Sequence, residues 1–230
     1  MEAIILAGGL GTRLKSEVSD VPKPMAPIGG RPFLEILLGT LQRKGFTRAI
    51  ISVGHMHNVI TEFFGDQFEG IELVYEIEDS PRGTGGAIAS AISHVRNDHV
   101  YILNGDTFLD FDICTVERSW KENEVPIIVT KRVEDATRYG ALAIDGSRIT
   151  GLGEKKVSGP AVINAGCYIV PPKIRDRFPV AARFSFENDF LSRDIKENVY
   201  MASLCLGEFI DIGVPEDFRR AQHALARLTI

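Results

Sequence analysis

The first part of the chain alternates apolar strand-like runs with segments of helical spacing, and this alternation constrains the fold more than any other feature. The expected strands are Ala3–Ala7, Arg48–Val53, Ile71–Tyr75 and His99–Leu103. The expected helices are Phe33–Lys44, His57–Phe64 and Gly86–Val95. Because strand–helix–strand units with right-handed crossovers build parallel sheets, we expect an α/β fold with a mostly parallel sheet flanked by helices.

The second part of the chain is richer in short strand-like runs and poorer in helical patterns. An Asp145-Gly146 pair between two of these runs favours a β-hairpin. The expected strands are Pro126–Thr130, Ala141–Ile144, Arg148–Leu152, Ile163–Val170 and Tyr200–Cys205, and the expected helices are Phe186–Leu191 and Pro215–Leu228. No repeat or linker interrupts the chain, so we expect a single domain over residues 1–230, with a first half (1–125) and a strand-rich second half (126–230).

Composition and charge exclude several classes of function. The chain has 230 residues, of which 44% are hydrophobic, and this is enough for one well-buried domain. Its formal net charge of −5 argues against sequence-independent nucleic-acid binding, which needs a basic face. Any phosphate site must therefore be local, built from a few placed cations and backbone amides.

Cysteine spacing and apolar runs bear on metal content and location. Cys114, Cys167 and Cys205 are too far apart for a zinc motif, and we expect three reduced, buried cysteines. No window approaches the roughly 18 apolar residues of a membrane span, so we expect no membrane association. The apolar run after Met1 is too short for a signal peptide, and we expect a cytoplasmic protein.

A glycine-rich segment, Leu6–Leu14 (LAGGLGTRL), directly follows the first expected strand. Glycines there let backbone amides approach an anion beyond the carboxyl end of the strand. A dinucleotide-binding loop needs a glycine where this chain has Leu14, and the Gly-Lys-Ser/Thr ending of a Walker loop is absent. A tight turn without a ligand is the simplest alternative, but three glycines with Arg13 favour a loop that wraps a triphosphate.

The segment Val21–Met25 (VPKPM) comes next and contains a lysine between two prolines. Prolines restrict the backbone on both sides, so we expect an extended segment that aims Lys23. A rigid loop with a solvated lysine is the alternative. Beside the glycine segment, a fixed ammonium group suits pyrophosphate, where negative charge builds as the leaving group departs.

These two segments together resemble the signature of the sugar-phosphate nucleotidyltransferases, the enzymes that make nucleotide sugars. Later segments keep the order found in that family, namely Gly83–Ala87, Asn104–Asp106, Glu154–Lys155, Asn164–Gly166 and Asp211–Asp217. The resemblance extends from Ala3 to the last expected helix. It implies the nucleotide-diphospho-sugar transferase fold, with a Rossmann-like nucleotide-binding half (1–125) packed beside a sugar-phosphate-binding half (126–230).

The resemblance also implies a reaction and a set of site residues. A sugar 1-phosphate attacks the α-phosphorus of a nucleoside triphosphate, and catalysis is positioning plus charge neutralisation. Implied nucleotide-binding residues are Leu6, Ala7, Gly8, Gly9, Gly11, Thr12, Arg13, Lys23, Gly83, Thr84 and Gly85, of which Arg13 and Lys23 are also the implied catalytic residues. Implied sugar-phosphate-binding residues are Tyr139, Gly140, Glu154, Lys155 and Asn164. The implied cofactor is Mg²⁺, with Asp106 and Asp211 as its ligands.

One position departs from the family pattern. The family often has proline after the Glu-Lys pair, whereas this chain has Lys156. Lys155 and Lys156 therefore both stay open as the lysine that faces the sugar phosphate.

Within the family, the chain resembles the D-glycero-D-manno-heptose 1-phosphate guanylyltransferases most, through the segments Phe184–Glu187 and Phe209–Asp217. This branch implies GTP and a heptose 1-phosphate as substrates and GDP-heptose as product. A guanylyl-, uridylyl- or thymidylyltransferase for a hexose 1-phosphate is the alternative, since one pocket residue can decide between such sugars. Family members are often oligomers, so we expect a homo-oligomer.

Two other classes of protein fit the sequence less well. A non-catalytic sensor of nucleotide sugars on the same fold predicts loss of Arg13, Lys23, Asp106 or Asp211, and all four are present. An NAD-dependent oxidoreductase needs the missing glycine and an acid after its second strand, where this chain has Val53-Gly54-His55.

Overall fold

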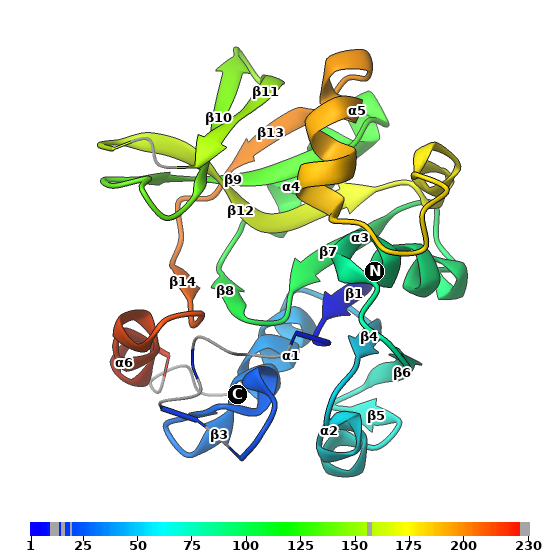
Figure 1. Cartoon of the computed structure of the whole chain (residues 1–230), viewed down its shortest axis with the longest axis vertical. Helices are drawn as coiled ribbons and strands as arrows, with labels where there is room; N and C mark the ends of the chain where they lie inside the picture. The colour runs from blue at the N-terminus through cyan, green and yellow to red at the C-terminus, as the bar shows by residue number, and fades with distance from the viewer. Residues whose placement is uncertain (10–13, 15–16, 19, 156–157, 226–230) are drawn as a thin grey trace.

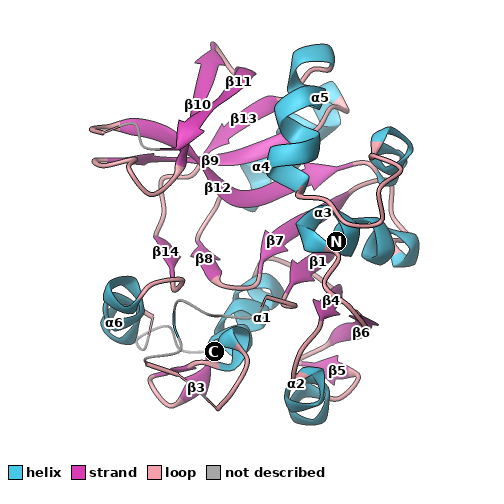
Figure 2. Ribbon diagram, in the orientation of Figure 1, coloured by secondary structure: helices cyan, strands magenta, loops and turns pink. Residues whose placement is uncertain are grey.

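A computed structural model describes residues 1–9, 14, 17–18, 20–155 and 158–225. Its main feature is a ten-stranded mixed sheet that runs through both halves of the chain (Figure 1). The strand order is β10-β11-β13-β9-β12-β7-β1-β4-β6-β5. Helices cover both faces of the sheet (Figure 2), as expected for an α/β fold.

The first half forms the parallel part of the sheet. β1 (Glu2–Leu6) lies between β7 (Val100–Asn104) and β4 (Arg48–Val53), and β4 pairs with β6 (Ile71–Ile77), all in parallel. The short strand β5 (Gln67–Phe68) closes this edge in an antiparallel pairing. The central strands are buried on both faces, which explains their continuous apolar runs.

Successive side chains of these strands point to opposite faces of the sheet and pack into two separate hydrophobic cores. On one face, Ile5 and Ile51 pack with α1 (Phe33–Arg43), α2 (His57–Phe64) and α4 (Ile113–Asn123). On the other face, Ile4 and Ile50 pack with α3 (Gly83–Ala91) and with the helical segment η5–α5 (Phe186–Leu191 and Ser192–Glu197). The period-two alternation of a strand thus separates the two layers of helices.

The second half extends the sheet with mainly antiparallel strands. β12 (Ala161–Val170) pairs with β7 on one side and β9 (Ile127–Val133) on the other. β10 (Gly140–Asp145) and β11 (Arg148–Lys155) form the expected hairpin, whose turn places Gly146 at a φ of 59°. β13 (Met201–Leu204) is parallel to β9.

The C-terminal segment returns to the first half. β14 (Phe209–Asp211) pairs with β8 (Thr107–Leu109), which places Asp211 opposite Thr107. α6 (Pro215–Ala224) then packs in a third core with the segment that contains the short strands β2 (Pro27–Ile28) and β3 (Arg31–Pro32). The Ile212 amide donates to the carbonyl oxygen of Asp106 at 3.0 Å, so this return brings the side chain of Asp211 close to Asp106.

Three local expectations differ from the structure. Lys23–Met25 is a short 3₁₀ helix rather than an extended segment, because prolines fit the first positions of a helix as well as extended backbone. Helix α4 was not expected, and as a consequence Cys114 in its first turn is exposed rather than buried. Helix α3 begins at Gly83 rather than Gly86 and gives way to a 3₁₀ turn, Ile92–His94.

Two further segments complete the list of elements. Pro172–Arg177 is a 3₁₀ helix, and the expected helix Phe186–Leu191 has π-helical hydrogen bonding before it continues as α5. Among the described residues, we find no helix with the length and apolar character that crossing a bilayer requires.

Candidate active site

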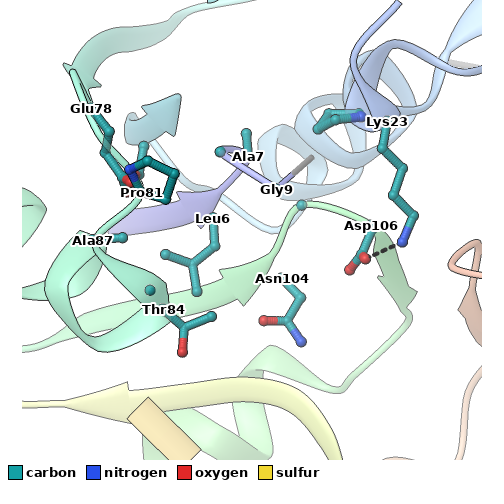
Figure 3. A pocket seen from close by; sticks show the side chains of 15 residues that line it. Leu6, Ala7, Gly9, Lys23, Glu78, Pro81, Thr84, Ala87, Asn104 and Asp106 are labelled. Atoms are coloured by element: carbon teal, nitrogen blue, oxygen red, sulfur yellow. Dashed lines mark hydrogen bonds and ion pairs between the residues drawn. The ribbon is translucent and has the colours of Figure 1, made fainter. Parts of the chain in front are cut away.

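A cavity of about 340 Å³ opens at the carboxyl ends of the parallel strands β1, β4, β6 and β7 (Figure 3). This nucleotide cavity is lined by Leu6, Ala7, Gly8, Gly9, Lys23, Pro24, Ser52, Glu78, Pro81, Gly83, Thr84, Ala87, Asn104, Gly105 and Asp106. It therefore lies where open α/β sheets bind ligands. Seven of the expected nucleotide-binding residues line it: Leu6, Ala7, Gly8, Gly9, Lys23, Gly83 and Thr84. Gly11, Thr12 and Arg13 lie outside the described residues.

The glycines of the Gly83–Ala87 segment have a packing role. Gly83 has a φ of 71°, and a Cβ there would lie 2.5 Å from the carbonyl oxygen of Phe184. A Cβ on Gly85 would lie 2.1 Å from the Phe184 ring, and Gly85 does not line the cavity. The need for glycine at these two positions thus comes from the approach of the Phe184 segment, and nucleotide binding by Gly85 stays a prediction.

Lys23 lies at one end of the nucleotide cavity. Its side chain is only 12% exposed, and its Nζ forms an ion pair with the Asp106 carboxylate (Figure 3). Asp106 follows β7 through Gly105, where a Cβ would lie 2.6 Å from the carbonyl oxygen of Leu6. Close packing of this turn against β1 therefore fixes where Asp106 leaves the sheet.

Asp211 approaches the same end of the cavity from β14. A Cβ on Gly213 would lie 2.7 Å from Asp211 Oδ1 and 3.1 Å from Lys23 Nζ, so these two groups are neighbours around that glycine. Burial raises the pKa of the Asp211 carboxyl, and the negative charge of Asp106 raises it further. The Gly213 amide, Lys23 and Arg138 oppose this shift without cancelling it.

The two carboxylates suit a magnesium ion that completes its coordination with phosphate oxygens and water. Burial, and then the charge of Asp106, raise the pKa of Asp211, and a divalent cation beside the two carboxylates would favour their ionised forms. The described residues contain no cluster of three or more His, Cys, Asp or Glu side chains that could hold a metal by itself. The donor set therefore fits a metal shared with the substrate rather than a closed structural site.

A second cavity, of about 480 Å³, lies over the antiparallel strands and meets the first at Asn104. Its lining, which includes the expected residues Tyr139, Gly140 and Asn164, consists of Asn104, Thr107, Arg138, Tyr139, Gly140, Leu152, Gly153, Asn164, Ala165, Gly166, Glu187, Asn188, Ser192, Phe209 and Asp211. We call it the sugar cavity. Of the expected residues Glu154 and Lys155 only the backbone is described, in β11, and Lys156 lies outside the described residues.

Arg138 lines the sugar cavity but was not expected from the sequence. Its Nη1 lies 2.7 Å from the buried Asp217 carboxylate, and its Nη2 lies 3.9 Å from Asp211 Oδ2. Its guanidinium also lies over the Tyr139 ring, 5.4 Å from the centroid. Two carboxylates and one ring thus fix a cation beside Asp211.

Asn164 belongs to a hydrogen-bonded group with two residues that sequence reasoning missed. Its side-chain amide donates to the Tyr168 hydroxyl at 2.7 Å and to Glu187 at 3.3 Å. The Tyr168 hydroxyl in turn donates to Glu187 at 2.6 Å. Burial, and then the charge of Glu187, raise the pKa of Tyr168, so this hydroxyl stays protonated and holds the carboxylate at the wall of the cavity.

Comparison with known proteins defines the class. The chain matches the Nucleotidyl transferase family over residues 2–227 and belongs to this family. It is 43% identical over 220 residues to D-glycero-alpha-D-manno-heptose 1-phosphate guanylyltransferase of Campylobacter jejuni, which covers 95% of this chain and 97% of the relative. The protein of the same name from Aneurinibacillus thermoaerophilus is 39% identical over 226 residues, or 98% of each chain.

A solved structure agrees with these relatives. HddC from Yersinia pseudotuberculosis, complexed with GMP-PN, superposes with a TM-score of 0.85 at 38% identity and covers 96% of this chain and 97% of its own. The family resemblance and the nucleotide-diphospho-sugar transferase fold expected from the sequence are therefore confirmed.

Proposed function

We propose that this chain condenses GTP with D-glycero-α-D-manno-heptose 1-phosphate to give GDP-heptose and pyrophosphate. The observation that carries the proposal is the meeting of two cavities at Asn104, with Asp106 in the lining of one and Asp211 in the lining of the other. Two substrates bound in these cavities would meet beside this pair of carboxylates. The choice of GTP and heptose rests on the names of the relatives, which cover nearly the whole chain.

The reaction follows from this arrangement. A phosphate oxygen of the heptose 1-phosphate forms a bond to the α-phosphorus of GTP, the bond to the bridging oxygen breaks, and pyrophosphate leaves with that electron pair. The attacking oxygen is already an anion, so no protein base is needed. Lys23, which pairs with Asp106, is the proposed contact for the pyrophosphate, with Arg13 as its predicted partner.

Mg²⁺, when bound, neutralises the charge of the reacting phosphates. Asp106 and Asp211 would hold it. Arg138 adds a fixed positive charge to the sugar cavity, next to Asp211, and is a candidate contact for the sugar phosphate. Tyr139, Gly140 and Asn164, with Glu154 and Lys155 from β11, are the proposed sugar-side contacts. A cytoplasmic location, a homo-oligomer and the absence of nucleic-acid binding stay predictions from the sequence.

Pyrophosphate release with Mg²⁺ tests the proposal directly. GTP, UTP, dTTP, CTP and ATP would each be combined with the 1-phosphates of heptose, mannose and glucose. We expect release that needs both substrates and is fastest with GTP and the heptose. Release with another pair would keep the reaction and replace the substrate. Binding of a nucleotide sugar without release from any pair would indicate the sensor instead.

A further inference from the structure

A further cavity lies against helix α3, and the proposed reaction does not use it. We call it the α3 cavity; its volume is about 320 Å³, and it shares no lining residue with the nucleotide cavity or the sugar cavity. Thr84 and Ala87 of α3 line the nucleotide cavity (Figure 3), whereas Gly86 and Ser90 line the α3 cavity. Because residues three or four positions apart share one face of a helix, α3 presents different faces to the two cavities.

The other wall of the α3 cavity is the segment 172–184, which joins β12 to η5 and lies beside α3 (Figure 1). Its charged residues are the acidic Asp176 and the basic Lys173, Arg175, Arg177 and Arg183. Arg177 pairs with the buried Asp194 at 2.8 Å, which leaves three of these cations against one carboxylate. In a chain of net charge −5, such a local excess of positive charge favours an anion at this wall.

Two arginines line the α3 cavity, one from each wall. Arg82, just before α3, donates from Nη1 to the Ser90 hydroxyl, and the same nitrogen lies 4.0 Å from Glu76 Oε1, so its guanidinium is held in place. Arg175 belongs to segment 172–184, and its exposed side chain has no hydrogen-bond or ion-pair partner among the described residues. Each guanidinium has five N–H donors, so both arginines retain donors for the oxygens of a phosphate group.

The same cavity also has an apolar side, to which Phe178, Pro179 and Ala181 contribute. The Phe178 ring packs edge-on against Phe190, with 4.8 Å between the ring centroids, and this contact fixes its orientation. A cavity that combines cations with an apolar wall suits a ligand that has both an anionic group and an apolar body. We propose that the α3 cavity is a second binding site, for a phosphorylated small molecule whose phosphate contacts Arg82 and Arg175 and whose apolar part lies against Phe178 and Pro179.

Binding at this site is coupled to nucleotide binding through Arg82 and Phe184. The Phe184 amide donates to the Arg82 carbonyl at 3.1 Å, and the Phe184 carbonyl accepts from the Gly85 amide at 3.0 Å. The Arg82 amide in turn donates at 3.2 Å to Glu78, which lines the nucleotide cavity. A phosphate that joins Arg82 to Arg175 would hold segment 172–184 against the start of α3. It would thus order a wall of the nucleotide cavity before the nucleotide binds, so we expect the affinity for GTP to rise.

Phenyl phosphate is a probe for the site, because it joins a phosphate to an apolar ring. We expect it to bind more tightly than inorganic phosphate, as followed by NMR of its ring protons at low ionic strength, and we expect phenol to leave its binding unchanged. Arg175→Ala should weaken the binding by roughly tenfold or more, since it removes a charge-assisted contact. Ala181→Glu adds a carboxylate at an exposed position of the lining and should abolish the binding by charge repulsion.

Two matched variants control for changes of charge outside the α3 cavity. Val180→Glu adds the same charge at the preceding, exposed residue, and Arg193→Ala removes an exposed arginine of α5; neither residue lines the cavity. Both variants should bind phenyl phosphate as the unmodified protein does, and so should Lys23→Ala and Arg138→Ala, which remove cations of the other two cavities.

Three results would overturn the site. The first is no binding of phenyl phosphate at millimolar concentration. The second is unchanged binding in folded Arg175→Ala and Ala181→Glu variants. The third is binding that is lost in Lys23→Ala or Arg138→Ala, because phenyl phosphate would then occupy the nucleotide cavity or the sugar cavity.

Calorimetry of GTP binding with Mg²⁺, in the presence and absence of phenyl phosphate, tests the coupling and requires no turnover. We expect phenyl phosphate to raise the affinity for GTP by roughly fivefold in the unmodified protein and to have no effect in Arg175→Ala. A lower affinity for GTP that persists in Arg175→Ala would show competition in the nucleotide cavity and would overturn the proposal. An unchanged affinity for GTP, together with phenyl phosphate binding that depends on Arg175, would support the site and overturn its coupling to the nucleotide cavity.

Discussion

The nucleotide cavity and the sugar cavity are built in different ways. The first lies at the carboxyl ends of parallel strands, and its lining combines strand ends and the segments that follow β1, β6 and β7 with residues of Lys23–Met25 and α3. The second lies over the antiparallel strands β10, β11 and β12, and residues of η5, α5 and β14 line it as well. The first cavity thus draws on strand ends and the turns beside them, and the second draws on the faces of strands and on helices that pack over them.

This difference suits different roles: chemistry common to the family in the nucleotide cavity, and choice of the sugar in the sugar cavity. Strand ends and tight turns place charges and amides where any nucleoside triphosphate needs them, so the chemistry can be common to the family. Side chains on the face of a strand can be exchanged one at a time without disturbing the backbone, which suits the choice of a sugar. Changes in the nucleotide cavity should therefore lower turnover with every sugar. Changes in the sugar cavity should act on one substrate, except at the proposed metal ligand Asp211.

The largest effect should come from Asp106→Asn. This change keeps the shape of the side chain and removes the charge of a proposed magnesium ligand, so we expect turnover to fall by roughly a thousandfold with every sugar tested. Pyrophosphate release at saturating substrates and increasing Mg²⁺ measures it. Asp110→Asn is the control, because Asp110 is an exposed carboxylate that pairs with Lys44 outside both cavities. Normal turnover in Asp106→Asn would show that Asp106 is not a ligand of the metal.

Lys23→Ala should have the next largest effect. Loss of the ammonium group that lies beside Asp106 should lower kcat by roughly a hundredfold, because the charge on the departing pyrophosphate is no longer neutralised. The KM of the sugar 1-phosphate should change little. Lys44→Ala removes a lysine from a comparable ion pair, Lys44–Asp110, and should leave kcat intact. An effect confined to the KM of the sugar 1-phosphate would show that Lys23 contacts the sugar phosphate rather than the pyrophosphate.

Much of the fold could be predicted because the periodicity of apolar residues distinguishes strands from helices. The expected strand Arg48–Val53 and helix His57–Phe64 coincide with β4 and α2. Helix α4 was missed because only Val116 and Trp120 of its residues are fully buried, which leaves a weak apolar stripe. The available signal was Asp112, whose side chain caps the helix by accepting from the Cys114 amide at 3.0 Å.

The site was predictable to the extent that its residues belong to short motifs. Lys23 and Asp106 occur in such segments, and both line the nucleotide cavity. Glu78, Arg138 and Glu187 were missed because their positions depend on partners distant in the sequence. Ser52 is 26 residues from Glu78, and Tyr168 is 19 residues from Glu187. The spacing of residues along the chain does not predict such contacts, because these residues become neighbours only when the sheet folds.

Arg138→Ala tests the role of the sugar cavity, which Arg138 lines. We expect the KM of the heptose 1-phosphate to rise by roughly tenfold, in line with the loss of one charge-assisted contact, while the KM of GTP stays within about twofold. Steady-state kinetics with each substrate varied in turn measures the two constants. Arg148→Ala, an exposed arginine on β11 outside both cavities, is the matched control. A rise in the KM of GTP alone would mean that the two cavities do not divide the substrates as proposed.

The smallest effect should be a change in stability caused by Asp211→Asn. The folded-state pKa of Asp211 is raised by burial and by the charge of Asp106, so folding favours the protonated form. The stability that this group contributes is thus present at low pH and is lost as the pH rises through the folded-state pKa. A neutral asparagine avoids this loss and can still accept the Gly213 amide hydrogen bond, which is 2.7 Å long in the structure.

In metal-free buffer, Asp211→Asn should therefore raise Tm by a few degrees at pH 7, and the gain should shrink as the pH falls toward 4. Thermal unfolding across this pH range measures it, with the exposed Asp79→Asn as a control that should show no such trend. Added Mg²⁺ with GTP should stabilise the unmodified protein more than the variant, because the proposed ligands of the metal, Asp106 and Asp211, line the two cavities. A lower Tm at pH 7 would show that the ionised Asp211 is already stabilised by Lys23 and Arg138, and the case for a divalent cation that joins the two cavities would be lost.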